Sequence, residues 1–167
     1  MKVTYKHTFN TDADTYWSKI FFDREYNERL FRDVLGFQYE LLELTEEPSG
    51  IRRRRVRIEP KTDAPAVVKK LIGDSIGYVE EGTFDPKSCK WSYRITTTKL
   101  SDKVSIAGIF WVEPRGDKKI ERLCDVDLNV KMFGVGGAIE EFIAKTTGDS
   151  YEKAHGFTNK FIAEKGL

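Results

Sequence analysis

Six strand-like segments fill the middle of the chain, and one long helical segment follows them. The strand-like segments are residues 37–46, 51–59, 76–84, 90–99, 104–113 and 119–132. Residues of high turn propensity separate them, as in Glu47-Pro48-Ser49-Gly50. Consecutive strands joined by short turns pair in an antiparallel meander, which can have one apolar and one polar face. The pattern therefore predicts an antiparallel sheet whose apolar face another layer must cover.

Residues 137–164 are predicted to form that covering layer as one helix. Apolar and small side chains recur there at i, i+3, i+4 and i+7, which is typical of an amphipathic helix. At 1.5 Å per residue the helix is about 40 Å long, enough to cross a whole sheet. Gly148 and Gly156 weaken it and are candidate kink positions. The stripe comprises Ile139, Phe142, Ile143, Thr146, Ser150, Ala154, Phe157 and Phe161.

The first third of the chain predicts one strand and two short helices. Residues 2–9 alternate between apolar and polar positions, as in a half-buried strand. A helix that begins near Thr11-Asp12-Ala13-Asp14 follows, and a second spans about 24–35. Residues 64–72 read as a short helical insertion between strands. No repeat or linker divides the chain, so we expect an α+β fold in a single domain over residues 1–167.

Charge and cysteine usage exclude several classes of protein. The 28 Lys+Arg and 27 Asp+Glu leave a net charge of +1, which argues against a nucleic-acid partner. Cys89 and Cys124 fit neither a disulfide framework nor a metal motif, and the start of the chain has no apolar signal region. These features predict a cytoplasmic protein without a metal or another cofactor. The aromatic content of 13% requires either a ring-rich core or a ring-lined cavity.

Two glycine motifs resemble catalytic or phosphate-binding turns. Gly73-Asp74-Ser75-Ile76-Gly77 matches the G-x-S-x-G nucleophile elbow, but the elbow needs a strand before it and a helix after it, and here that order is reversed. We therefore interpret Ser75 as a loop serine. Gly134-Val135-Gly136-Gly137 lacks the third glycine of a dinucleotide fingerprint. It predicts a tight turn with a positive φ and a close approach of the long helix to the sheet.

The densest charge lies in residues 52–57, which include five arginines. On a strand, Arg53, Arg55 and Arg57 share one face, and Arg52 and Arg54 share the other. We expect a solvated edge strand. Two alternatives are transient contact with an anionic membrane surface and an arginine that reaches into a cavity to meet a carboxylate or phosphate.

Other polar residues give no enzyme signature. His7 lies on the same strand face as Val3, Tyr5 and Phe9, which favours a hydrogen-bonded interior histidine over a general base. Asp125 and Asp127 share the face opposite Cys124, Val126 and Leu128 and are interpreted as solvated carboxylates.

Three stretches of the chain resemble the helix-grip superfamily of the START lipid-transfer domains and the birch-pollen allergen, in particular an uncharacterised bacterial branch. The stretches are residues 5–9 with 12–17, residues 64–71, and residues 134–143. The resemblance covers essentially the whole chain and implies a β-α-α-β(6)-α order, with a seven-stranded curved antiparallel sheet around the C-terminal helix. It also implies a hydrophobic ligand cavity between the two.

On this resemblance, inward positions are candidates to line the cavity, although each also suits ordinary packing. Val68 and Leu71 of the insertion are candidates for an entrance lid. The expected function is binding or transport of a hydrophobic, lipid-like molecule. Alternatives are an enzyme of the polyketide cyclase or hydrolase type, with His7 or a tyrosine as acid–base group, and a protein-interaction module. The cavity candidates are Tyr5, His7, Tyr78, Trp91, Tyr93, Phe110, Cys124 and Phe142.

Overall fold

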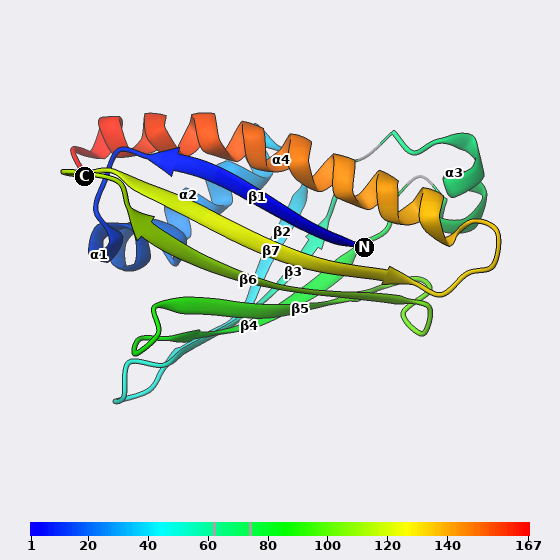
Figure 1. The fold of residues 1–167 in the computed structure, drawn as a ribbon, viewed down its shortest axis with the longest axis horizontal. Coiled ribbons are helices and arrows are strands. Elements are labelled where there is room, and N and C mark those ends of the chain that lie inside the picture. The colour runs from blue at the N-terminus through cyan, green and yellow to red at the C-terminus, as the bar shows by residue number, and fades with distance from the viewer. Residues whose placement is uncertain (62, 74) are drawn as a thin grey trace.

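One antiparallel sheet of seven strands forms the centre of the computed structural model, which describes residues 1–61, 63–73 and 75–167 (Figure 1). Across the sheet the strands run β1-β7-β6-β5-β4-β3-β2, so that β2 to β7 form the predicted meander and β1 pairs with β7. The strands are β1 (Lys2–Phe9), β2 (Gln38–Glu46), β3 (Arg52–Glu59), β4 (Tyr78–Asp85), β5 (Lys90–Thr97), β6 (Val104–Pro114) and β7 (Ile120–Val130).

A single long helix, α4 (Gly136–Lys165), covers the sheet. It contacts β1 and β7 and runs along them (Figure 1). Its 30 residues correspond to about 45 Å, and it continues without a break through both glycines named above. Tyr5 fixes it to β1, because its hydroxyl donates a hydrogen bond of 2.7 Å to the Ala144 carbonyl. A Cβ at Gly148 would lie 3.3 Å from the Tyr5 ring, so this glycine serves the contact between helix and strand.

The two predicted short helices each begin as an α-helix and end in a π-helical turn. They comprise α1 (Ala13–Thr15) with η1 (Tyr16–Phe21), and α2 (Arg24–Glu28) with η2 (Arg29–Val34). Asp12 and Asp23 cap them, since their carboxylates accept the N–H groups of Thr15 at 2.8 Å and Tyr26 at 2.7 Å. The wider π turns place the bulky η1 side chains toward the sheet, where Tyr16, Trp17, Ile20 and Phe21 are buried.

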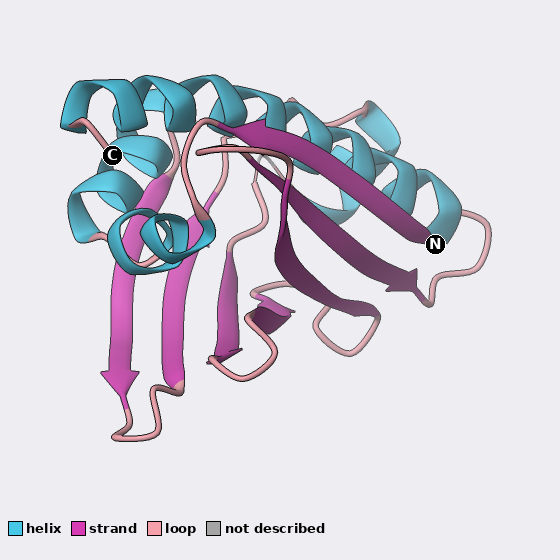
Figure 2. Ribbon diagram, turned by 60° about the vertical axis from the view of Figure 1, so that its left-hand side comes forward, coloured by secondary structure: helices cyan, strands magenta, loops and turns pink. Residues whose placement is uncertain are grey.

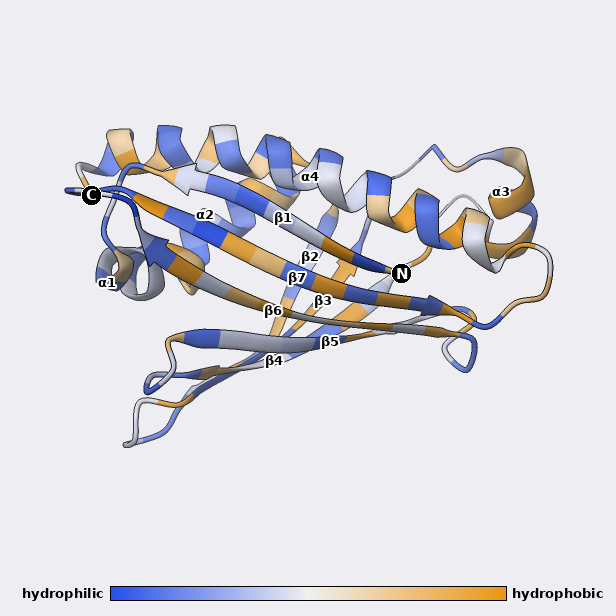
Figure 3. Cartoon of the chain, viewed as in Figure 1, coloured by the Kyte–Doolittle hydropathy of each residue, from blue (hydrophilic) through white to orange (hydrophobic). Residues whose placement is uncertain are grey.

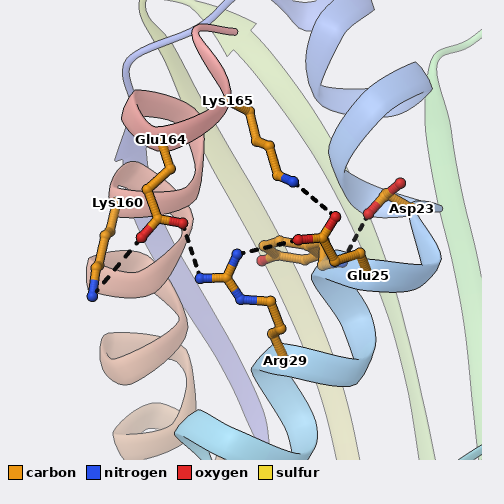
Figure 4. Close-up of polar contacts among 7 residues, drawn as sticks. Asp23, Glu25, Arg29, Lys160, Glu164 and Lys165 are labelled. Atoms are coloured by element: carbon orange, nitrogen blue, oxygen red, sulfur yellow. Dashed lines mark hydrogen bonds and ion pairs between the residues drawn. The ribbon is translucent and has the colours of Figure 1, made fainter.

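Charged side chains join α2 and the start of η2 to the last turns of α4 (Figure 4). Arg29 lies 3.4 Å from Glu25 and 2.9 Å from Glu164, and Lys165 lies 2.8 Å from Glu25. The Arg29 guanidinium also covers the ring of Phe157 at 5.2 Å. These contacts hold the short helices at one end of the space beneath α4 (Figure 2).

The insertion α3 (Ala66–Ile72) lies at the opposite end, beside the start of α4 (Figure 1). The turn into α4 is the predicted tight turn, since Gly134 has a φ of +76° and a Cβ at Gly136 would collide with the Val130 carbonyl. Apolar residues are interspersed with polar ones along β1 and β7 (Figure 3). The buried apolar residues of these strands belong to the core. No helix in the described part of the chain is long and apolar enough to cross a membrane.

Candidate ligand-binding cavity

A cavity of about 220 Å³ lies between the sheet, α4 and the short helices. The helix contributes residues at i, i+3, i+4 and i+7 spacing over 15 positions, so the cavity follows α4 for about 22 Å. The first six residues of the predicted apolar stripe are all among them. The lining residues of α4 are Ile139, Phe142, Ile143, Thr146, Thr147, Ser150, Tyr151 and Ala154.

Alternate residues of the strands line the cavity, and two glycines allow rings from the neighbouring strand to lie close to the sheet. A Cβ at Gly108 would lie 2.5 Å from Cζ of Tyr93, and a Cβ at Gly82 would collide with the Trp91 ring. Both rings therefore lie flat against the neighbouring strand. Side chains that lie flat leave space above them, which is where the cavity lies. Lining residues from the strands include Tyr78, Glu80, Tyr93, Ile95, Val104, Ile106, Phe110, Val126 and Leu128.

The wall contains a buried ion pair. Arg54 of β3 lies 3.1 Å from Glu80 of β4, and the exposed fractions of the two side chains are 8% and 15%. Arg54 also donates a hydrogen bond of 3.0 Å to the carbonyl of Phe21 and lies 4.6 Å above the Phe21 ring. Removing either partner would leave a desolvated charge, which is strongly unfavourable. The pair therefore locks β3, β4 and η1 together around the cavity.

A second arginine in the wall has no acidic partner among the described residues. Arg122 of β7 is 5% exposed, and its Nε is buried without a hydrogen-bond partner. Its guanidinium carbon lies 5.2 Å from the ring of Phe9, 5.3 Å from that of Phe110 and 5.0 Å from that of Tyr151. The π faces of these rings stabilise the cation in place of a carboxylate.

His7 holds the Arg122 guanidinium from behind. Its Nδ1 lies 3.3 Å from Nη2 of Arg122, and its Nε2 lies 3.1 Å from Glu152. A guanidinium can only donate, so Nδ1 accepts and the proton is on Nε2, which donates to Glu152. Burial, and then the charge of Arg122, lower the pKa of His7 and keep it neutral. His7 is thus the interior, hydrogen-bonded histidine predicted from its strand face.

The remaining titratable groups near Arg122 are held in their neutral forms. The Cys124 thiol lies 3.8 Å from the hydroxyl of Tyr93 and 3.7 Å from that of Tyr151. Burial raises the pKa of Cys124 to about 11 and raises the pKa of both tyrosines well above their usual value. A thiol with such a pKa is a poor nucleophile at neutral pH. The neutral tyrosines keep their hydroxyl protons and can donate hydrogen bonds.

The structure divides the predicted cavity residues into two groups. Tyr78, Tyr93, Phe110 and Phe142 line the cavity. Tyr5, His7, Trp91 and Cys124 are not among the lining residues; they hold α4, orient Arg122 or pack beneath the rings. In the insertion, Val68 is fully buried in the core and Leu71 is 38% exposed, while their neighbour Ile72 lines the cavity.

The pattern of residues 52–57, where Arg54 lies, indicated a cavity arginine only as an alternative, and no pattern pointed to Glu80 or Arg122 as cavity residues. The alternation of side chains between the two faces of a strand could have indicated two of these residues. Arg54 shares a strand face with the buried Val56 and Ile58. In the same way Arg122 shares a face with the buried Cys124 and with Val126.

The arginine-rich strand β3 is not the predicted edge strand, because it is hydrogen-bonded to β2 on one side and to β4 on the other. Its two faces nevertheless differ as expected. Arg53, Arg55 and Arg57 are exposed, and each lies within 3.0 Å of a glutamate, as expected for a solvated face. Arg54 reaches the cavity and meets a carboxylate there, that of Glu80.

The predicted loop serine lies in a loop between α3 and β4, where its hydroxyl donates a hydrogen bond of 2.9 Å to Glu59. Asp74 of the same motif lies outside the described residues. The His155 ring is engaged elsewhere, 2.9 Å from the Thr8 carbonyl. Within the described residues no group of three or more His, Cys, Asp or Glu side chains could hold a metal ion.

Comparison with known proteins gives one family match and many similar folds. The family model described as protein of unknown function (DUF2505) matches residues 4–162. No match was found among curated protein sequences.

Three solved structures show the similarity in fold. The Zhui aromatase/cyclase from Streptomyces sp. R1128 is 14% identical, with a TM-score of 0.66 and 97% of this chain and 95% of that chain covered. A START superfamily protein from Mycobacterium smegmatis is 13% identical, with a TM-score of 0.58 and coverages of 96% and 98%. A norcoclaurine synthase point mutant from Thalictrum flavum is 15% identical, with a TM-score of 0.64 and coverages of 100% and 96%. At these identities the similarity shows the predicted helix-grip fold and nothing further.

Proposed function

The chain belongs to the DUF2505 family of proteins of unknown function, and we propose that it binds a hydrophobic small molecule in the cavity between its sheet and α4. The observation that carries the proposal is the cavity itself, about 220 Å³ with a wall made mostly of apolar side chains. An apolar cavity of about 150 Å³ can hold benzene, so by proportion this one has room for about nine non-hydrogen atoms.

Two proteins of similar fold also support the binding of a small molecule. An aromatase/cyclase and a synthase solved with a transition state analogue are among the proteins of this fold. We favour binding over acid–base catalysis for this chain, because the titratable groups in its wall are held in one state. Tyrosines with raised pKa values stay protonated, and Glu80 is engaged with Arg54. A cyclase that uses the same cavity is the alternative.

The proposal includes anchors and an entrance. Hydroxyl groups of Tyr78, Tyr93 and Tyr151 orient the ligand while the apolar wall removes it from water. The helix α3, which carries Val68 and Leu71, covers the end of the cavity that Ile72 lines and acts as the lid. We place the protein in the cytoplasm. Membrane contact through the arginine-rich strand has less support, since its exposed arginines are paired with glutamates.

The test has two parts. Native mass spectrometry of the purified protein, followed by organic extraction, shows whether an apolar compound co-purifies. Calorimetric titration of the extracted protein with octanamide then measures binding of an uncharged, mainly apolar probe of suitable size.

Matched variants link that binding to the cavity. Ile143→Trp places a larger ring on the lining face of α4 and should abolish octanamide binding. Glu141→Trp places the same ring on the exposed face of the helix and should leave binding unchanged. Absence of both a co-purified compound and octanamide binding would refute the proposed function.

A further inference from the structure

We propose, building on the proposed function, that the ligand carries a single anionic group, a carboxylate, which Arg122 receives at the ring-lined end of the cavity. Its apolar body extends along α4 toward α3. The proposal rests on the charge balance of the wall, the geometry of one guanidinium and the division of the cavity into two chemically different ends.

The charge balance leaves one positive charge without compensation. Among the described residues that line the cavity, three have side chains that are charged at neutral pH: Arg54, Glu80 and Arg122. Arg54 and Glu80 neutralise each other at 3.1 Å. The tyrosines in the wall stay neutral. Arg122 therefore gives the cavity a net charge of one, and a monoanion is the complementary ligand.

The guanidinium has unused donors where such a ligand would lie. Arg122 is 5% exposed and lines the cavity, and its Nε has no hydrogen-bond partner. Its Nη2 contacts His7, and its side chain also hydrogen-bonds to Tyr16. A guanidinium has five N–H donors in a planar fork that matches a carboxylate. A buried cation without a counter-charge is unfavourable, and an incoming carboxylate would relieve this. His7, which is neutral and acts as an acceptor, orients the fork without neutralising its charge.

The two ends of the cavity differ in chemistry. Rings of Phe110, Tyr151 and Tyr16 lie at the Arg122 end, where the Tyr16 hydroxyl hydrogen-bonds to Arg122 and the Tyr151 hydroxyl lies 3.7 Å from the Cys124 thiol. Aliphatic residues line the α3 end: Ile72, Ile76, Leu100, Val104, Ile139 and Ile143. An amphiphile with a carboxylate head therefore has one orientation, with its head at Arg122, near the start of β7, and its body toward α3.

The test compares acids with amides of the same skeleton at pH 7.5. Octanoate is paired with octanamide, and 3-phenylpropanoate is paired with 3-phenylpropanamide. Hydrogen bonds to a charged group make octanoate bind about tenfold to 100-fold more tightly than octanamide to the unaltered protein. The pair with the larger ratio shows whether the body is an alkyl chain or an aromatic group. Equal affinities within both pairs would overturn the inference and leave the proposed function intact, whereas failure of all four probes would refute both.

Variants of Arg122 test whether this residue causes the preference for the acid over the amide. Arg122→Met removes the charge at similar length and should reverse the order, so that octanamide binds more tightly than octanoate. Arg122→Lys keeps the charge without the fork and should keep part of the preference. Octanamide binding by each variant reports that its cavity is folded. A preference for octanoate that survives in Arg122→Met would place the anion elsewhere and overturn the inference.

One measurement needs no variant. In protein labelled with ¹⁵N at arginine, octanoate should shift the Nε–H resonance of Arg122, while octanamide should shift it less. An Arg122 resonance that octanoate leaves unchanged at saturation would contradict the proposed contact.

Discussion

Replacing Glu80 with glutamine tests what determines the contribution of an ion pair to stability in this sheet: the burial of its side chains or the distance between its charged atoms. The variant keeps the shape of the side chain and removes its charge. Arg54 then remains buried without a counter-charge, although the Phe21 carbonyl, the neighbouring rings and the glutamine oxygen still contact it. Breaking a buried pair by removing one partner costs about 3–5 kcal/mol. Because Arg54 keeps those contacts, we expect a loss near the lower limit, about 3 kcal/mol.

A matched control lies on the other face of the same two strands. Arg55 and Glu81 are direct neighbours across β3 and β4, and their separation of 2.6 Å is shorter than the 3.1 Å of the buried pair. Their side chains, however, are 47% and 55% exposed. Exposed pairs contribute at most about 1 kcal/mol, so Glu81→Gln should have a small effect although it breaks the shorter contact.

Urea unfolding followed by circular dichroism gives the free energies of unfolding, and thermal unfolding checks them. For a chain of this size, about 3 kcal/mol corresponds to a fall in Tm of about 6–12 °C. Replacing both members of the buried pair, as in Arg54→Met with Glu80→Leu, should recover most of the loss, because no charge remains desolvated. The reasoning is refuted if Glu81→Gln destabilises as much as Glu80→Gln, or if the double variant is less stable than Glu80→Gln alone.

Three further predictions concern the thiols, one histidine and two glycines. Iodoacetamide at pH 8 should label the native protein once, at the exposed Cys89, because burial raises the pKa of the Cys124 thiol to about 11; mass spectrometry detects a second label only if that thiol is accessible. The pKa of His7 is lower in the folded protein than in the unfolded chain, so the unfolded chain takes up a proton first as the pH falls below about 6.5, and the free energy of unfolding decreases. His7→Gln should make the free energy of unfolding depend less on pH in urea titrations between about pH 7.5 and 5.5. Gly108→Ala should lower the free energy of unfolding by about 1–3 kcal/mol, since the new Cβ would lie 2.5 Å from the Tyr93 ring. Gly156→Ala adds a Cβ that meets no atom within 4 Å, and it should raise the free energy of unfolding by up to about 1 kcal/mol. The opposite order in urea unfolding would contradict this.

The order and ends of most elements follow from periodicity, because each depends on a local pattern. The alternation in residues 119–132 and the i, i+3, i+4 stripe of 137–164 predicted β7 and α4 to within about two residues. The π-helical ends of the two short helices were not predicted, because a π turn shows the same apolar residues as an α-helix. The N-cap at Asp12 falls within the predicted start of the first helix.

The cavity wall was only partly predictable, because the sequence shows which face of a strand a side chain is on but not whether other side chains cover it. Trp91 and Tyr93 have the same parity, yet Tyr93 lines the cavity and Trp91 does not. Both rings lie over a glycine of the neighbouring strand, but Phe21, Phe22 and Arg54 pack against Trp91. These are contacts between residues distant in sequence. Arg122 was missed for a different reason: its charge favoured a solvated position, although its strand parity with Cys124 and Val126 indicated an inward one.

The near-zero net charge of the chain and the charged cavity are compatible, because the two quantities are set in different places. On the surface, pairs such as Arg55 with Glu81 cancel one another, and they dominate the total of +1. Inside, water does not screen a charge, so a single guanidinium without a carboxylate partner sets the charge of the cavity wall. The aromatic content contributes to both features, since Phe110 and Tyr151 line the cavity and, together with Phe9, stabilise the cation. A ring-lined cavity therefore need not be neutral, and in this fold the rings are what allow Arg122 to remain buried without an acid.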